Sequence, residues 1–205
     1  MNEQEARDYI RSLAGQSAID RLEHLLELLI AENARQNLVS AGSLGETWTR
    51  HFADSAQLLP HGGDKDRPWI DLGSGAGFPG LVIAALAPDR EVVLVEQRPL
   101  RAAWLERAAA ELHLPHCNVA NHNVRNMPAM VAGTISARAF APLRKLLAMA
   151  RHLSDQSTVW LLPKGRTASA EHRELSDHLR AMFHVEPSLT APDGGIIIGV
   201  GKGRP

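Results

Sequence analysis

The sequence predicts an α/β fold in which a mostly parallel sheet is covered by helices on both faces and preceded by an N-terminal helical cap. Short apolar runs alternate with helical segments from residue 68 onward, a pattern typical of strands joined by crossover helices. A glycine-rich turn follows the first apolar run, and residues 1–60 contain only helical patterns. We therefore expect a cap over residues 1–60 and a sheet domain over residues 61–205.

The cap is predicted from apolar residues at helical spacing and from two capping boxes. Ser17 with Asp20 forms the first box, because a hydroxyl followed three residues later by an acid is typical of a helix start. The second box is Ser43 with Glu46, and Pro60 would end its helix. The first of these helices carries apolar residues on one face at Ile19, Leu22, Leu25, Leu26 and Leu29.

The sheet domain follows a polar loop rich in Gly and Pro at 61–68. Apolar runs predict strands at 69–72, 91–95, 118–121, 134–137, 158–163 and 196–200. Helical patterns separate most of these runs, and they predict helices at 79–86, 100–112, about 141–153 and about 168–182.

Composition limits the classes of function. The chain has 205 residues and a net charge of -1, so it lacks the overall positive charge of a dedicated nucleic-acid binder. Its single cysteine excludes an internal disulfide, and the N-terminus lacks a signal-peptide pattern, which indicates the cytoplasm. No apolar run reaches the roughly 18 to 20 residues of a membrane helix. We expect no membrane partner and a monomer.

Four possible metal ligands lie close together in the sequence. Their spacing matches no common zinc pattern, and they run from a helix end into a strand. We therefore expect no metal site at His113, His116, Cys117 and His122.

The glycine-rich turn, DLGSGAGFPG at residues 71–80, predicts a cofactor site. Its backbone amides and the following helix favour an anionic group, and missing side chains allow close approach. Gly75 belongs to this cradle, but it also begins a GxGxxG pattern typical of dinucleotide binding. Asp71 favours S-adenosylmethionine, because a carboxylate can accept from an amino acid ammonium but would repel a pyrophosphate. Glu96 suits a pair of ribose hydroxyls in either cofactor.

Several further motifs resemble one known family. They are NLVS at 37–40, RH at 50–51 followed by DS at 54–55, PG at 79–80, ISARAFA at 135–141 and KG at 164–165. In these motifs the chain resembles the glucose-inhibited division protein B family, also called RsmG. Its members use S-adenosylmethionine to methylate N7 of a guanine in 16S ribosomal RNA of the small subunit. The resemblance implies a Rossmann-like class I methyltransferase fold, with ribosomal RNA or an assembling small subunit as partner.

The resemblance also implies roles for individual residues. Gly73 and Phe78 would line the cofactor, Glu96 would hold its ribose, and Arg138 would reach the site from the fourth strand. The adenine would be flanked by two residues after the third strand, Val124 and Arg125. The chain departs from the family pattern at Glu32, Val39, Leu100 and Arg125, where tryptophan, threonine, lysine and an acid are common.

Guanine N7 has an unprotonated lone pair, so methyl transfer to it needs alignment and charge control rather than a general base. We therefore expect no general base and assign no catalytic residue. Arg50, Arg138 and Lys164 are candidate phosphate contacts, and His51 is a candidate base contact. Two local alternatives stay open. Arg50 could form an ion pair with Asp54 on the same helix face. His51 could form a hydrogen bond with Ser55.

Two other functions share the glycine-rich turn. A nicotinamide-dependent oxidoreductase would use the same cradle, but no second catalytic domain follows the sheet. A nucleotide-binding module without chemistry is the other alternative, and only the family resemblance argues against it.

Overall fold

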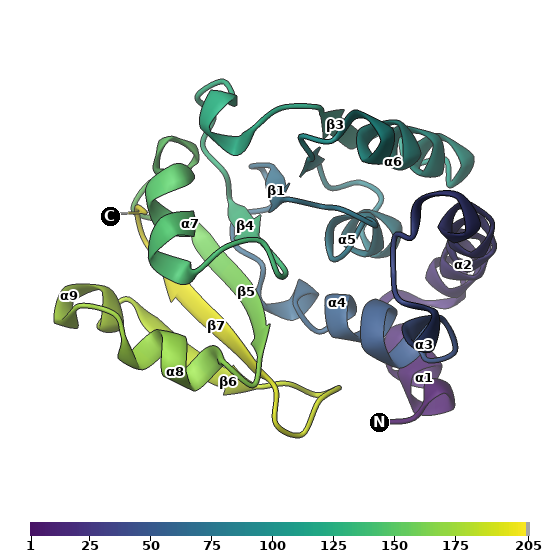
Figure 1. The fold of residues 1–205 in the computed structure, drawn as a ribbon, viewed down its shortest axis with the longest axis horizontal. Helices are drawn as coiled ribbons and strands as arrows, with labels where there is room; N and C mark the ends of the chain where they lie inside the picture. The colour runs from purple at the N-terminus through teal and green to yellow at the C-terminus, as the bar shows by residue number, and fades with distance from the viewer. Residues whose placement is uncertain (204–205) are drawn as a thin grey trace.

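A computed structural model describes residues 1–203 and contains a seven-stranded sheet with helices on both faces (Figure 1). The strand order is β3-β2-β1-β4-β5-β7-β6. Strands β1 to β5 run parallel, β7 runs antiparallel to β5, and β6 runs antiparallel to β7. Their bounds are β1 (Trp69–Leu72), β2 (Val92–Val95), β3 (Cys117–Ala120), β4 (Thr134–Ser136), β5 (Val159–Gly165), β6 (Phe183–Pro187) and β7 (Gly195–Val200). The predicted α/β class is confirmed.

The helices fall into two groups that cover opposite faces of the sheet (Figure 1). The first group is α1 (Glu3–Ala14), α2 (Gln16–Gln36), α3 (Ala41–Leu44), the π-helix η1 (Trp48–Ala53), α4 (Asp54–Ala56), the 3-10 turn η2 (Leu59–His61), α5 (Gly80–Leu86) and α6 (Pro99–Glu111). The second group is η3 (Val124–Asn126), α7 (Leu143–Met149), η4 (Arg151–Leu153), α8 (Ala168–Arg173) and α9 (Asp177–Arg180).

Strand β1 shows how the sheet separates two hydrophobic cores. Trp69 packs on the side of α2, α5 and α6, whereas Ile70 and Leu72 pack on the side of α7. Successive side chains of a strand point to opposite faces, so an apolar run buried throughout supplies both cores. The cap helices share the first core with α5 and α6, and the cap therefore packs directly on one face of the sheet.

The helix starts in the cap differ from the prediction. Both predicted capping boxes are wrong, since α2 begins after Gly15 with Ser17 already inside it, and Ser43 lies within α3. Gly15 has φ +79°, a backbone conformation that side chains disfavour, and this break sets the start of α2. The capping box that does form is Asn2 with Glu5 at the start of α1.

The helix that carries Arg50 and His51 is a π-helix rather than the regular helix expected there. Its first amides are bound from α1, because the Glu3 carboxylate accepts from Trp48 N at 3.0 Å and from Thr49 N at 2.8 Å. Helix starts leave such amide groups without partners inside the helix. Glu3 therefore fixes the position of this segment.

The C-terminal part of the sheet contains a strand that was not predicted. β6 is an outer strand in which Phe183 and Val185 alternate with His184 and Glu186. The helix expected at about 168–182 is divided into α8 and α9, because the backbone is extended at Ser176. The remaining predicted strands and the helix at 79–86 are confirmed to within two residues.

Among the described residues, no helix is both long enough and apolar enough to cross a membrane.

Candidate active site

The glycine-rich turn lies where β1 ends, between β2 and β4. Gly73 N donates to Val95 O at 2.8 Å, and Gly75 N donates to Glu96 Oε2 at 3.0 Å. Both glycines have positive φ values, +72° and +57°. A Cβ at Gly73 would collide with the Phe140 ring, whereas a Cβ at Gly75 would meet little. The turn therefore keeps an open backbone surface at the carboxyl edge of the sheet, where ligands bind in folds of this type.

Asp71, near the end of β1, fixes the shape of this turn through hydrogen bonds. Its side chain is 0% exposed, and it accepts from Ser136 Oγ at 2.7 Å and from Gly80 N at 3.2 Å. Burial raises the pKa of the Asp71 carboxyl above its usual value. We expected this carboxylate to face the ammonium of a cofactor, but it is enclosed and instead ties β1 to β4 and to the start of α5. Its contribution is to the shape of the turn.

A cavity of about 380 Å³ lies above the turn. Gly73, Glu96 and Val124 line it, as predicted for a cofactor site, and Phe140 forms another wall. Its volume falls in the range of about 300 to 1,000 Å³ that is usual for small-molecule sites. The open glycine backbone and the carboxylate at the end of β2 suit S-adenosylmethionine, which would be cradled at Gly73 and held at Glu96.

The structure does not bring every predicted cofactor residue to this cavity. Gly75 acts through its backbone bond to Glu96, and Phe78 is buried beneath the turn. Arg125 is exposed beside Val124, and Arg138 lines a different cavity. Glu96 itself accepts from Gly75 N and from Arg98 N at 2.8 Å, and each carboxylate oxygen can accept a further hydrogen bond.

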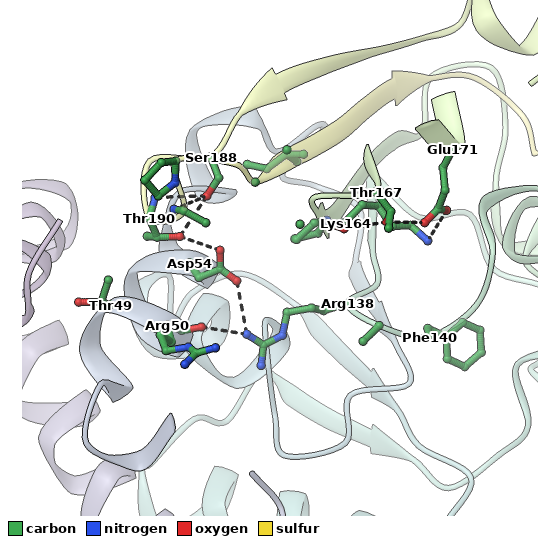
Figure 2. Close-up of a pocket in the computed structure, with 18 of the residues that line it drawn as sticks. Thr49, Arg50, Asp54, Arg138, Phe140, Lys164, Thr167, Glu171, Ser188 and Thr190 are labelled. Carbon is green, nitrogen blue, oxygen red and sulfur yellow. Dashed lines mark hydrogen bonds and ion pairs between the residues drawn. The ribbon is translucent and has the colours of Figure 1, made fainter. Parts of the chain in front are cut away.

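The second cavity is larger, about 1290 Å³ (Figure 2). It lies between the cap, the segment after β4, β5 with α8, and the loop that joins β6 to β7. Ala139, Phe140 and Ala141 line both cavities. The two compartments therefore adjoin at the segment that follows β4.

Arg138 connects the elements around the larger cavity (Figure 2). It donates to the backbone oxygen of Arg50 at 3.2 Å and pairs with Asp54 Oδ2 at 3.4 Å. Its Nη2 lies 3.3 Å from His51 Nδ1, and its guanidinium lies 5.2 Å from the Phe78 ring centre. Arg138 thus joins the end of β4 to the cap and to the glycine-rich turn.

The His51 ring packs against Phe78 and Arg138. It stacks on Phe78 with ring centres 4.8 Å apart and is 8% exposed. Burial, followed by the charges of Arg138 and Arg50, lowers the pKa of His51 to about 4. Ser55 Oγ donates at 2.6 Å to the backbone oxygen of His51 rather than to its ring. Ring atom Nε2 is buried and has no partner among the described residues.

The other two candidate RNA contacts are paired inside the protein. Arg50 pairs with Glu46 at 3.2 Å, so the alternative pairing with Asp54 is wrong because Asp54 pairs with Arg138. Lys164 donates to Ala141 O at 2.8 Å and pairs with Glu171 Oε2 at 3.0 Å, with a side chain 8% exposed. The positive charges of both residues are compensated.

One hydrogen-bond network at the larger cavity was not predicted from the sequence. Asp54 accepts from Thr190 Oγ1 at 2.9 Å, and Gln57 accepts from Leu189 N at 2.8 Å. These bonds join the cap to the loop after β6 across 136 and 132 positions, and residues so distant in sequence give no local signal. Within residues 1–203, no group of three or more His, Cys, Asp or Glu could hold a metal ion.

The sheet order, the open glycine turn and the acid at the end of β2 define the class of protein, an S-adenosylmethionine-dependent methyltransferase. Solved structures of similar fold include a ribosomal protein L11 methylase from Lactobacillus delbrueckii subsp. bulgaricus, with TM-score 0.59, 12% identity and coverage of 73% of this chain and 77% of that chain. A mutant of MtNAS in complex with S-adenosylmethionine gives TM-score 0.53 at 15% identity, covering 90% of this chain and 76% of that chain. At these identities the likeness shows the fold alone.

Sequence relatives identify the family. The family model described as GidB, rRNA small subunit methyltransferase G, matches residues 18–191. A ribosomal RNA small subunit methyltransferase G from Erythrobacter litoralis is 47% identical over 202 residues, covering 98% of each chain. Another from Novosphingobium aromaticivorans is 48% identical over 203 residues, covering 97% of this chain and 88% of that protein. The chain belongs to the rRNA small subunit methyltransferase G family, and the oxidoreductase alternative is not favoured.

Proposed function

We propose that the protein transfers a methyl group from S-adenosylmethionine to N7 of a guanine in small-subunit ribosomal RNA. The observation that carries this proposal is the meeting of two cavities at residues 139–141. The smaller one offers the glycine turn and Glu96 to a cofactor, and the larger one has room for a nucleotide. A methyl donor and its acceptor need such adjoining compartments, because alignment of the reacting atoms lowers the barrier.

The cofactor roles follow from position at the small cavity. Gly73 offers backbone to close approach, and Glu96 has acceptor capacity for ribose hydroxyls. Val124 and the backbone of Arg125 flank the adenine in this proposal. Three residues would act without touching the cofactor. Gly75 orients Glu96 through its backbone bond, and Arg138 packs over the ring of Phe78 within the turn.

The chemistry requires little from acids or bases. When bound, S-adenosylmethionine supplies an electrophilic methyl group, and guanine N7 supplies an unprotonated lone pair. The protein therefore has to orient the base and exclude water. Ala139 and Phe140 form the wall between the compartments, and we assign this orientation to them. A carboxylate poised as a general base has no part in the proposal.

RNA contact by Arg50, His51 and Lys164 stays a prediction. Arg50 lies at the mouth of the larger cavity with its side chain 58% exposed, and it could exchange Glu46 for a phosphate at small cost because exposed ion pairs are weak. Lys164 would have to leave Glu171 and Ala141 O. His51 Nε2 is buried in this structure, so contact between this atom and a base would require the ring to become exposed.

We further propose that the protein works in the cytoplasm as a monomer, on small-subunit RNA or on the assembling subunit. The division into a cap at 1–60 and a methyltransferase domain at 61–205 belongs to the same proposal. It is supported by the wall that the cap contributes to the larger cavity through Thr49, Arg50 and Asp54. The cap would then carry part of the substrate site.

The experiment uses ribosomal RNA and small subunits from cells that lack the enzyme. Purified protein is incubated with S-adenosylmethionine labelled in its methyl group, and the labelled nucleotide is mapped by strand scission at 7-methylguanosine. We expect label at one guanine N7 in the small-subunit RNA. Label on another base atom, or only on large-subunit RNA, would refute the proposal. Binding of the cofactor without any transfer would favour the non-catalytic binding module.

A further inference from the structure

Positive charge is distributed unevenly along this chain of net charge -1. No Asp or Glu lies between Glu111 and Asp155, and none lies between Glu96 and Glu106. These two stretches nevertheless contain seven basic side chains: Arg98, Arg101, Arg125, Arg138, Arg144, Lys145 and Arg151. Unbalanced positive charge is therefore concentrated in two segments.

Five of these cations lie on the elements that begin at one edge of the sheet. Helix α6, turn η3 and helix α7 follow the parallel strands β2, β3 and β4, so each begins at the carboxyl edge, where the small cavity lies. Arg98, Arg101 and Lys145 line this cavity. Arg125 is next to Val124, which forms part of its wall. We call this group the basic rim; it consists of Arg98, Arg101, Arg125, Arg144 and Lys145.

The basic rim is electrostatically available. In the described part of the chain, none of its five side chains has an ion pair or a hydrogen bond. The cations of the larger cavity differ, because Arg50, Arg138 and Lys164 are paired with Glu46, Asp54 and Glu171. Free cations can replace the counterions of a polyanion without first breaking an internal ion pair.

An exposed apolar side chain stands within the basic rim. Leu100 is 73% exposed and lies between Arg98 and Arg101 in the sequence. A surface that mixes cations with an apolar contact suits a ligand that alternates phosphates with planar bases, as a single RNA strand does.

We propose that the basic rim binds the phosphodiester backbone of the RNA strand beside the target nucleotide, while the larger cavity takes the target base. This inference rests on the proposed function. Residues 139–141 line both cavities, so a strand lying along the rim can pass its base over this segment. The inference assigns the main phosphate contacts to the rim and not to Arg50 or Lys164.

The test measures binding of a small-subunit RNA fragment, without cofactor, over a series of salt concentrations. The double variant Arg98→Gln/Arg144→Gln removes two rim charges. Each phosphate contact contributes about 0.7 to 0.9 to the slope of log affinity against log salt, so we expect the slope to fall by about 1.4 to 1.8. The affinity at moderate salt should fall on the order of tenfold.

A matched control removes two charges at the opposite edge of the sheet. Lys65 precedes β1 and Lys202 follows the antiparallel strand β7, and Lys65→Gln/Lys202→Gln should leave the slope nearly unchanged. Equal decreases in the salt slope of the two double variants would overturn the inference. A larger decrease in Lys164→Ala would also overturn it. Cofactor affinity, measured by calorimetry in each variant, reports any damage to the cofactor cavity.

Failure of this inference is distinguishable from failure of the proposed function. Wild-type protein that labels guanine N7 while the rim variant keeps its full salt slope would refute the rim and retain the function. Wild-type protein that labels no RNA would refute the function, whatever the salt slope.

Discussion

Atom Nδ1 of His51 lies 3.3 Å from Nη2 of Arg138, and this contact joins the cap to the end of β4. An arginine can only donate hydrogen bonds, so Nδ1 must accept and a neutral His51 carries its proton on Nε2. A protonated ring would place a second donor and a second positive charge against the guanidinium. The neutral ring therefore helps to hold Arg138 between the glycine-rich turn and the larger cavity.

Replacement of His51 by two different amides tests this contact. In His51→Asn the side-chain oxygen can take the place of Nδ1, whereas His51→Gln places its amide near Nε2. We expect His51→Asn to retain kcat/KM within about threefold and His51→Gln to lose about tenfold, because hydrogen bonds to charged groups contribute about 1.5 to 3 kcal/mol. Methyl transfer to small-subunit RNA measures both variants.

The same variants separate the Arg138 contact from a direct RNA contact through Nε2. If His51→Gln were the better substitute, the ring would act through Nε2 and our account of Arg138 would be wrong. Circular dichroism and thermal unfolding check that both variants fold.

Protonation of His51 makes stability depend on pH. Its pKa is about 4 in the folded protein and about 6.5 in an unfolded chain. The unfolded chain therefore takes up the proton first as the pH falls, and stability is lost between about pH 6.5 and pH 4, with no further loss from this group below pH 4. The contribution is up to about 3 kcal/mol.

Urea unfolding of the wild type and of His51→Asn at several pH values measures this effect. Carboxylates titrate in both proteins and cancel in the difference. We expect the wild type to lose stability relative to the variant as the pH falls from about 6.5 to about 4. Parallel pH curves for the two proteins would contradict this account of His51.

Gly73 and Gly15 have similar positive φ values and different surroundings, and they form a matched pair. Their φ values are +72° and +79°, and a Cβ would strike Phe140 at Gly73 but nothing within 4 Å at Gly15. Substitution by alanine should cost each protein about 1 to 2 kcal/mol through backbone strain. Only Gly73→Ala should also weaken cofactor binding, by roughly tenfold or more, as measured by calorimetry. Unchanged cofactor affinity in Gly73→Ala would remove Gly73 from the site.

Asp71 and Ser136 should behave as a coupled pair in unfolding experiments. Ser136 Oγ donates to Asp71 and accepts from Trp69 Nε1 at 2.8 Å. Asp71→Asn keeps one acceptor oxygen for two donors and should cost about 1 to 3 kcal/mol, as buried groups without partners do. Ser136→Ala should cost a similar amount, and the double variant should cost less than the sum of the two. Additive losses in urea unfolding would show that the two side chains act independently.

The parallel part of the sheet was predictable because its strands are short apolar runs between turn residues. The outer strand β6 was not, since Phe183 and Val185 alternate with polar residues directly after a helical pattern. The start of α2 was also misplaced, because the left-handed backbone of Gly15 outweighs a possible cap at Ser17.

The residues that line the smaller cavity were more predictable than the pairing of the cations at the larger one, for a physical reason. Gly73, Glu96 and Val124 follow consecutive strands, and the carboxyl ends of parallel strands meet at one edge. Whether the charges of Arg50 and Lys164 are free to contact RNA depends on which acids lie near them in space. Sequence spacing suggested Asp54 for Arg50, but Asp54 is taken by Arg138 from β4, and no local pattern reports that competition.

The bonds from Gln57 to Leu189 and from Asp54 to Thr190 span 132 and 136 positions. One wall of the larger cavity thus comes from the first third of the chain and another from its last tenth. During synthesis the early helices can fold onto the sheet, but this cleft stays open on one side until the β6–β7 hairpin has left the ribosome. The order of translation therefore completes this cleft last, after the rest of the fold is in place.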